Sequence, residues 1–315
     1  MIENQLWVES YRPKKIEDCV LIDDIKTVAQ GIVEKRAMPN MMLVGSAGTG
    51  KTTLAQALCN ELEYDFIKIN CSNDRGIDLL RTQLVQFASS VSLNSDMKVV
   101  ILDEADHMTP LLQAGLRNFI EEFHKTTRFV LTANYPGKII EPLHSRCAVL
   151  DFTIKSKDKA RMAAEIMKRT IGILDKEGVK YDKKAVAELI TKFFPDFRRI
   201  INEMQRYASI TGVIDTGILG ALETLSVKDF VDALRAKSFK KARTWIVENL
   251  AVTDQQHIYR SIYDNLADYV EPSSIPTAIL LIANYQYRGM TSIDPEVQMS
   301  AFAIELMQSL EWKND

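Results

Sequence analysis

The sequence predicts an α/β domain with a parallel five-stranded sheet and helices on both faces, followed by purely helical segments. Strand-like and helix-like segments alternate over residues 1–152, an order typical of a parallel sheet whose two faces are covered by helices. From residue 155 onward the pattern is helical only. The expected strands are short apolar runs, which lie near residues 41–44, 66–70, 98–103, 128–133 and 148–152.

The length and the pattern together predict three domains. With 315 residues, the chain is too long for one hydrophobic core. A basic run over residues 155–184, with ten Lys or Arg against five Asp or Glu, opens the helical part of the chain. Three glycines between Gly212 and Gly220 then interrupt it. We therefore expect domains at residues 1–152, 153–224 and 225–315.

The composition is that of a soluble globular protein, with 46% hydrophobic and 26% charged residues. Its 39 basic and 42 acidic residues give a net charge of −3, so any contact with nucleic acid must be local. The four cysteines contain no CxxC pair, which argues against a disulfide framework and a zinc site. The first residues lack a signal-peptide pattern, and the longest apolar stretch is too short for a bilayer. We expect a protein of the cytoplasm, or of the host cytoplasm if it is viral, that is neither secreted nor membrane-bound.

A glycine-rich motif indicates a site for nucleoside triphosphates. Gly45 to Thr52 reads GSAGTGKT, and it lies between the strand at 41–44 and a helical pattern from Thr53 to Tyr64. Backbone N–H groups of such a turn surround phosphate oxygens, while Lys51 reaches the outer phosphates and the Thr52 hydroxyl ligates Mg²⁺. An ordinary strand-to-helix turn is the alternative, which the flanking elements disfavour. The residues expected to hold nucleotide here are Gly48, Thr49, Gly50, Lys51, Thr52 and Thr53.

Two carboxylates at the end of the third strand indicate hydrolysis of the bound nucleotide. Asp103 would hold magnesium, and Glu104 would polarise the attacking water. Alternatively, an acidic pair at this place would only cap the following helix. Asp103 to Asp106 also spells Asp-Glu-Ala-Asp, the box of a class of RNA helicases. Such helicases need two motor domains, and no second strand-helix unit follows residue 152.

Three further polar residues are candidates for the hydrolytic site. Asn134 follows the fourth strand, where it would contact the γ-phosphate or the attacking water, or serve only as a turn residue. Arg146 precedes the fifth strand, and Arg198 lies where a helix of the second domain is expected to begin. Each arginine is either a solvated surface charge or a cation that stabilises the charge developing during phosphoryl transfer. In the second case, one arginine would come from a neighbouring subunit and the other from the chain that holds the nucleotide.

In combination, these motifs resemble the ATPase subunits of sliding-clamp loaders, AAA+ proteins such as the small subunits of replication factor C, and most closely those of T-even-type bacteriophages. The resemblance covers residues 6 to about 205. It is carried, in chain order, by Trp7 to Pro13, the phosphate loop, Asn73 to Asp78, Asp103 to Asp106, Thr132 to Tyr135, Ser145 to Cys147 and Asp196 to Arg199. The final hundred residues match only by length and helicity.

The resemblance implies an ATP- and Mg²⁺-dependent subunit whose helical lid follows the AAA+ domain and whose helical collar mediates oligomerisation. Copies of it and a non-identical subunit would form a five-subunit spiral, which opens a sliding clamp and loads it onto primer-template DNA. Arg146 would be the arginine finger on the adjacent subunit's ATP, and Arg198 the sensor of its own. The adenine side would be lined by Val8, Glu9, Ser10, Tyr11, Arg12 and Val20.

The same resemblance assigns the segment from Cys71 to Leu93 to DNA and clamp. Asn73, Arg75 and Arg81 would contact the phosphate backbone near a helix N-terminus, and the alternative is two solvated arginines. Phe87 matches the clamp contact of family members, yet it lies on an apolar stripe that also suits a core residue.

Departures from the family pattern accompany this assignment. Pro195 replaces a glycine before the lid helix, Gly115 replaces an alanine inside a helix at a cost of about 1 kcal/mol, and Asn118 replaces a basic residue.

Two other functions stay open at this point. One is a different AAA+ machine, such as a helicase loader or branch-migration motor, and the other is an ATP-binding structural subunit without turnover.

Overall fold

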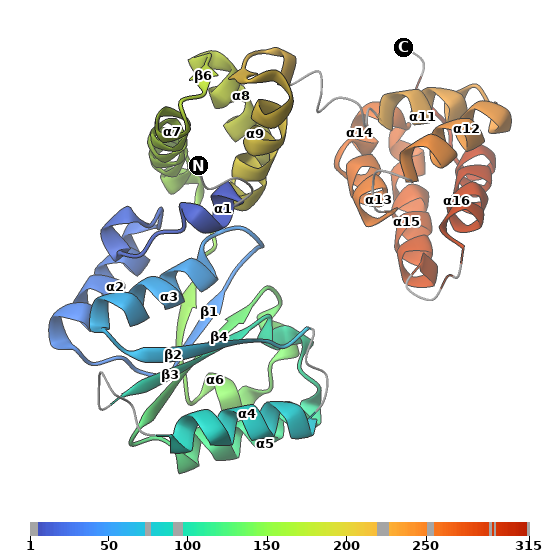
Figure 1. The fold of residues 1–315 in the computed structure, drawn as a ribbon. Coiled ribbons are helices and arrows are strands. Elements are labelled where there is room, and N and C mark those ends of the chain that lie inside the picture. Colours follow the sequence, from blue (N-terminus) through green and yellow to red (C-terminus); the bar gives the residue numbers. More distant parts are fainter. Residues whose placement is uncertain are drawn as a thin grey trace. The chain divides into compact units, whose positions relative to one another are not determined.

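The structure of the chain is a computed structural model, and it divides into two compact units, Met1–Leu219 and Gly220–Asp315. It describes residues 6–72, 77–90, 97–218, 227–250, 255–289, 292 and 294–313. Figure 1 shows the elements of both units, which are treated separately below. The expected boundaries at 152/153 and 224/225 stay predictions.

A five-stranded parallel sheet forms the centre of the first unit, in the order β2-β3-β4-β1-β5. The strands are β1 (Met41–Val44), β2 (Asp65–Asn70), β3 (Lys98–Asp103), β4 (Thr127–Ala133) and β5 (Ala148–Asp151). All five predicted strands are therefore confirmed, with small differences at their ends. Val44 pairs with Ala133 and Asn70 with Asp103, so the carboxyl ends of β1 to β4 meet at one edge. This edge is where ligands bind in open parallel sheets.

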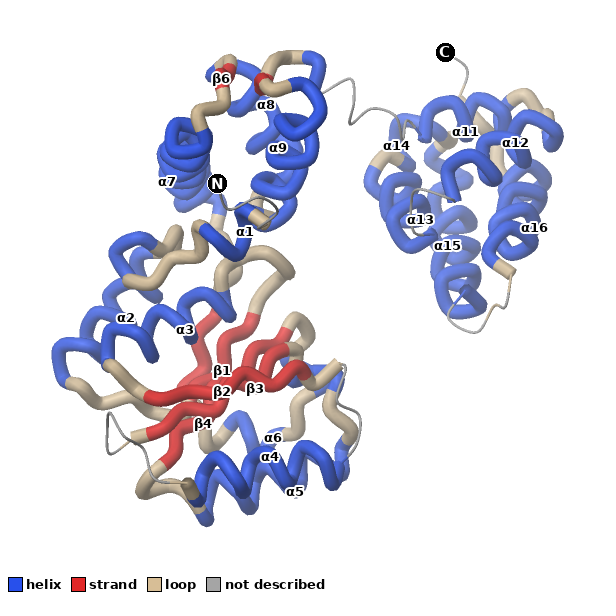
Figure 2. Tube along the Cα trace, in the orientation of Figure 1, coloured by secondary structure: helices blue, strands red, loops and turns tan. Residues whose placement is uncertain are grey.

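Helices cover both faces of the sheet, as predicted (Figures 1 and 2). On one face α2 (Asp23–Lys35) and α3 (Lys51–Leu62) pack over Met41, Leu43, Val99 and Ile101. On the other face α4 (Ile77–Ser89), α5 (Pro110–Glu122) and α6 (Glu141–His144) pack over Met42, Val44, Val100 and Leu102. Because alternate strand residues enter different cores, β1 and β3 are apolar almost throughout.

The rest of the first unit is mainly helical. Its long helices are α7 (Ser156–Glu177), α8 (Lys183–Phe193) and α9 (Phe197–Thr211), and α9 begins where the Asp196 carboxylate accepts a hydrogen bond from the Arg199 N–H at 3.0 Å. A small parallel pair, β6 (Lys180–Tyr181) and β7 (Val213–Ile214), was not predicted, because two-residue strands carry no periodicity. The remaining elements are short: α1 (Trp7–Ser10), η1 (Ile16–Asp18), η2 (Ala105–His107) and η3 (Pro136–Lys138).

The second unit is helical around its own core. Its elements are α11 (Val227–Arg235), α12 (Phe239–Leu250), α13 (Gln255–Asp264), α14 (Leu266–Tyr269), η5 (Pro272–Ser274), α15 (Ile275–Gly289) and α16 (Pro295–Ser309). Aromatic pairs occupy the core, with ring centroids 4.8 Å apart for Phe230 and Trp245 and 5.0 Å apart for Tyr259 and Phe302. In the described part of the chain, no helix combines the length and apolarity that a bilayer crossing requires.

Candidate functional site

A cavity of about 390 Å³ lies at the carboxyl ends of the strands in the first unit. The phosphate loop, the end of β3, the end of β4, the N-terminal segment and α9 all contribute to its wall. It therefore brings together residues from distant parts of the sequence. The predicted site residues that line it are Val8, Glu9, Tyr11, Arg12, Gly48, Thr49, Gly50, Lys51, Thr52, Thr53, Asp103, Glu104, Asn134 and Arg198.

The phosphate loop encloses the Lys51 ammonium. Its Nζ donates to the carbonyls of Gly45 at 2.7 Å and Ser46 at 2.8 Å, and to the Asn134 Oδ1 at 2.9 Å. Lys51 is only 8% exposed, and this burial lowers the pKa of the ammonium from 10.5 to about 8. The loop thus holds a cation beside the N-terminus of α3, an arrangement that suits phosphate oxygens.

Close contact with α9 explains one glycine of the loop. Gly48 has a φ of +75°, and a Cβ built on it would lie 2.0 Å from the Asp196 Oδ1 and 2.9 Å from the Asp196 Cα. Only glycine fits this conformation and this space. The phosphate loop therefore contacts the start of the helix that carries Arg198.

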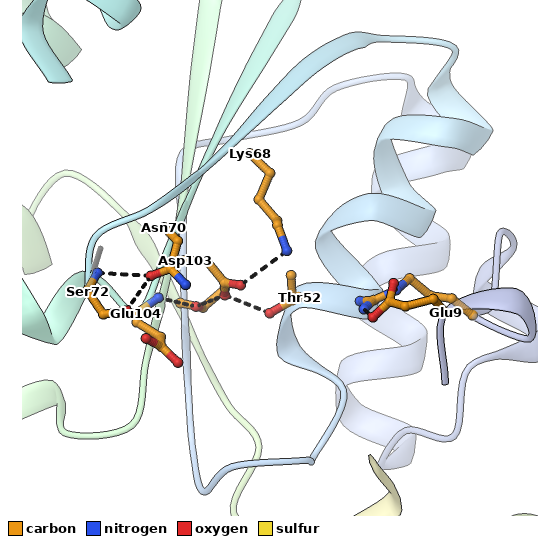
Figure 3. A network of polar contacts seen from close by, with 9 residues as sticks. Glu9, Thr52, Lys68, Asn70, Ser72, Asp103 and Glu104 are labelled. Carbon is orange, nitrogen blue, oxygen red and sulfur yellow. Dashed lines mark hydrogen bonds and ion pairs between the residues drawn. The ribbon is translucent and has the colours of Figure 1, made fainter. Parts of the chain in front are cut away.

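A network of hydroxyls holds Asp103 at the end of β3 (Figure 3). Its Oδ1 accepts hydrogen bonds from the Thr52 Oγ1 at 2.7 Å and from the Thr132 Oγ1 at 2.6 Å. The Thr132 Oγ1 in turn accepts the N–H of Glu104 at 3.0 Å. A carboxylate with adjacent hydroxyl oxygens is a hard donor set that fits Mg²⁺, which takes most of its other ligands from phosphate and water. The described residues contain no cluster of three His, Cys, Asp or Glu side chains that would form an all-protein metal cage.

Glu104 adopts an unusual backbone conformation. Its φ of 56° and ψ of 44° lie in the left-handed region, which costs a non-glycine residue about 1–2 kcal/mol. The following buried carboxylate, Asp106, accepts the N–H groups of Asn134 at 3.3 Å and Tyr135 at 3.2 Å. Asp106 therefore joins the turn after β3 to the turn after β4, and Glu104 and Asn134 from these turns both line the cavity.

The N-terminal segment contributes charged and aromatic side chains to the wall. Arg12 donates two hydrogen bonds to Glu9, at 3.1 and 2.5 Å, and lowers the pKa of that carboxyl. The Tyr11 hydroxyl donates to Glu177 at the end of α7 at 2.6 Å, which raises the pKa of Tyr11 to about 12. The half-buried guanidinium of Arg169 in α7 donates to the Tyr11 carbonyl at 2.7 Å. These contacts attach the segment to the helices that follow the sheet.

The sixth residue assigned to the adenine side lies at a second cavity. Val20 and Leu21 line an apolar space of about 60 Å³ that adjoins Gly48, Gly50 and Thr53. Of the other five residues, Ser10 lies in α1 and lines neither cavity. An apolar space beside the phosphate loop suits a nucleobase, and the adenine-side assignment stays a prediction.

The structure places Arg146 outside the cavity of its own chain. Its guanidinium donates to the Glu121 Oε1 from Nε at 3.0 Å and from Nη2 at 2.5 Å, and to the Pro142 carbonyl at 2.9 Å. Its side chain is 32% exposed. Arg198, by contrast, lines the cavity. The two arginines therefore differ in position, as expected if they serve different nucleotide sites.

The residues assigned to DNA and clamp are only partly described. Asn73 and Arg75 lie outside the described residues, and Arg81 lies in α4. Phe87 is half-buried against the core on the α4 side of the sheet, and the Lys98 ammonium lies 5.3 Å from its ring centroid. The clamp contact of Phe87 stays a prediction.

Sequence reasoning gave no role to four residues that shape the site. Thr132, Lys68 and Asn70 line the cavity with Asp103 and Glu104, and Asp106 accepts the N–H groups of Asn134 and Tyr135. The strand ends that carry Thr132 and Asn70 were recognised. Their partners depend on which strands are neighbours, and the hydrophobic pattern does not specify the strand order.

Comparisons with known proteins agree with this architecture. The model of the ATPase family associated with various cellular activities (AAA) matches residues 41–153, and the model of the sliding-clamp-loader large subunit, AAA+ ATPase lid domain, matches residues 158–220. A replication factor C small subunit from Staphylothermus marinus is 33% identical over 97% of this chain and 95% of its own length. The sliding-clamp-loader large subunit of Escherichia phage RB69 is 34% identical over 97% and 96%.

Among solved structures, the Thermotoga maritima RuvB Holliday junction branch migration motor has a similar fold. Its TM-score is 0.56 at 20% sequence identity, with 81% of this chain and 79% of that chain covered. This similarity concerns the fold alone.

Proposed function

This chain belongs to the family of sliding-clamp-loader ATPase subunits, and from that premise we propose that its cavity binds ATP with Mg²⁺ and hydrolyses it to load a clamp onto DNA. The protein is an AAA+ ATPase of DNA replication. One observation carries the proposed chemistry: the phosphate loop, Asp103 and Glu104 meet at a single cavity that Arg198 also lines.

The proposed roles follow from the chemistry of each side chain. Lys51 neutralises the outer phosphates, and Thr52 and Asp103 hold Mg²⁺ through their oxygens. Glu104 polarises the attacking water, and Asn134 orients that water or the γ-phosphate. Bound magnesium would neutralise charge that develops on the phosphates. Arg198, on α9, lines the same cavity and binds the same nucleotide.

A neighbouring subunit completes each site in this proposal. Arg146 is paired with Glu121 on the surface of its own chain, away from its own cavity, so it is available to a neighbour. An arginine supplied in trans typically accelerates phosphoryl transfer by about 10³ to 10⁵. We place copies of this chain and a non-identical subunit in a five-subunit assembly, in the cytoplasm where the DNA is replicated.

The proposed partners of that assembly are a sliding clamp and primer-template DNA. Asn73, Arg75 and Arg81 contact the DNA backbone, and Phe87 contacts the clamp. Lysine and arginine contacts to phosphate position a protein on DNA without reading its sequence, which suits loading at any primer end.

The proposal is tested by the rate of ATP hydrolysis of the purified assembly, with and without clamp and primed DNA together. We expect clamp and DNA to stimulate hydrolysis, and Glu104→Gln to reduce the stimulated rate by about 10² to 10⁴ while nucleotide binding is retained. Glu34→Gln, an exposed substitution in α2, is the matched control. A rate that clamp and DNA leave unchanged would refute loading. An unaffected Glu104→Gln assembly would instead favour a structural subunit without turnover.

A further inference from the structure

Lys68 places a second ammonium group at the cavity, next to Asp103. It lies in β2, between Ile67 and Ile69, which face the core on the α4 side. Because side chains alternate along a strand, Lys68 points to the opposite face of the sheet, where it lines the cavity. Its Nζ lies 3.7 Å from the Asp103 Oδ2 (Figure 3).

The two oxygens of Asp103 have different neighbours. Both hydroxyls, of Thr52 and Thr132, donate to Oδ1, whereas the Lys68 ammonium faces Oδ2. The Asp103 side chain is 15% exposed and the Lys68 side chain 39% exposed, so the ammonium belongs to the more solvent-accessible partner of this ion pair. The ammonium therefore lies on the carboxylate oxygen that the hydroxyls do not use.

We propose that Lys68 is a positioning residue that balances the charge of Asp103 and competes with Mg²⁺ for it, thereby setting the Mg²⁺ concentration that nucleotide binding requires. This inference rests on the proposed magnesium-nucleotide site. Two cations repel each other across a few ångströms, so a dication that reaches Asp103 must displace the ammonium. Displacement is inexpensive, because an exposed ion pair contributes little and lysine has a flexible stem.

Two other cations that line the cavity, Lys51 and Arg12, have partners other than Asp103. Lys51 donates to loop carbonyls and Asn134, and Arg12 pairs with Glu9. Within the described residues, the ion pair of Asp103, the proposed metal ligand, is with Lys68. Without magnesium, it keeps the triphosphate from facing an unbalanced carboxylate.

The test measures binding of a fluorescent ATP analogue to the full chain, first in EDTA and then during a Mg²⁺ titration. We expect Lys68→Met to lower the half-saturating Mg²⁺ concentration by about two- to fivefold, the range for loss of an exposed competing ion pair. The same variant should bind the analogue more weakly than wild type in EDTA. Lys68→Arg retains the charge and should behave as wild type. Lys35→Met, an exposed substitution in α2, is the background control.

A half-saturating Mg²⁺ concentration that is unchanged or raised in Lys68→Met would overturn the competition. Equal behaviour of Lys68→Met and Lys68→Arg would overturn it as well, because the charge would then be irrelevant. If wild type itself failed to bind the analogue, or bound it independently of Mg²⁺, the proposed nucleotide site would fail together with the inference. Thermal unfolding of each variant verifies that the chain is folded.

Discussion

The hydroxyl of Thr132 connects the two residues proposed to bind metal and activate water, so its removal is a direct test of the site's construction. Thr132 is 2% exposed, and in Thr132→Val a methyl group replaces its hydroxyl, which donates to Asp103 at 2.6 Å and accepts from the Glu104 N–H at 3.0 Å. The substitution keeps the side-chain volume and β-branching, and both hydrogen bonds are lost.

The expected cost follows from these two bonds. A hydrogen bond to a charged group contributes about 1.5–3 kcal/mol, and a buried N–H left without a partner costs about 1–3 kcal/mol. The added methyl group recovers about 0.8 kcal/mol of burial. We therefore expect Thr132→Val to lower the free energy of unfolding by about 2–5 kcal/mol. It should also free Glu104 to leave its left-handed conformation, with a loss of ATP hydrolysis.

Thr127 supplies a matched control on the same strand. It is fully buried, and its Oγ1 has no hydrogen-bond partner within the described part of the chain. Thr127→Val therefore removes a buried hydroxyl that contributes nothing, and we expect it to be neutral or to stabilise the protein by about 1 kcal/mol. Urea unfolding of the nucleotide-free protein measures the free energy of unfolding of both variants. Hydrogen exchange at the Glu104 amide reports whether that N–H has lost its hydrogen bond. Equal effects of the two substitutions on stability would refute the reasoning.

Two further predictions concern the phosphate loop. Gly48→Ala should weaken nucleotide binding at least tenfold and destabilise the protein by about 1–2 kcal/mol, because residue 48 has a left-handed conformation and its new Cβ would collide with Asp196. Gly31→Ala is the control: its Cβ would enter open space inside α2, and it should stabilise the protein by about 0.5–1 kcal/mol. Calorimetric binding and thermal unfolding check this pair, and equal affinities would contradict it. Lys51→Met should stabilise the nucleotide-free protein below pH 8. Burial of the charged ammonium is unfavourable there, and the gain should fade between pH 8 and 10.5 as the unfolded chain also loses its proton. Unfolding curves across this pH range test it, and a gain that grows with pH would contradict it.

The strands and the phosphate loop could be predicted because their signals are local. Met41 to Val44 and Val99 to Leu102 are apolar runs, followed by Gly45 and Asp103, and both positions were confirmed as β1 and β3. The helix after the loop was also predicted, although it begins at Lys51 rather than Thr53. Local composition was sufficient for these elements, because a strand buried on both faces has few polar positions.

The contacts that assemble the site were not predictable in the same way. Thr132 reaches Asp103 because β4 lies beside β3, and Lys68 reaches it because β2 lies on the other side. Strand order is decided by how the helices cover the sheet, and hydrophobic periodicity says nothing about it. The close approach of Gly48 to Asp196 likewise depends on the position of α9 against the phosphate loop.

Complementation between two inactive variants tests most directly whether neighbouring subunits share each ATP site. Assemblies made only of Lys51→Met chains or only of Arg146→Ala chains should hydrolyse ATP slowly. When the two are mixed in equal amounts, about a quarter of the interfaces between neighbouring copies would join an intact Lys51 to an intact Arg146. The rate of hydrolysis should recover in proportion to that fraction of interfaces. A mixture as inactive as its parents, or full activity of the Arg146→Ala assembly alone, would contradict the account.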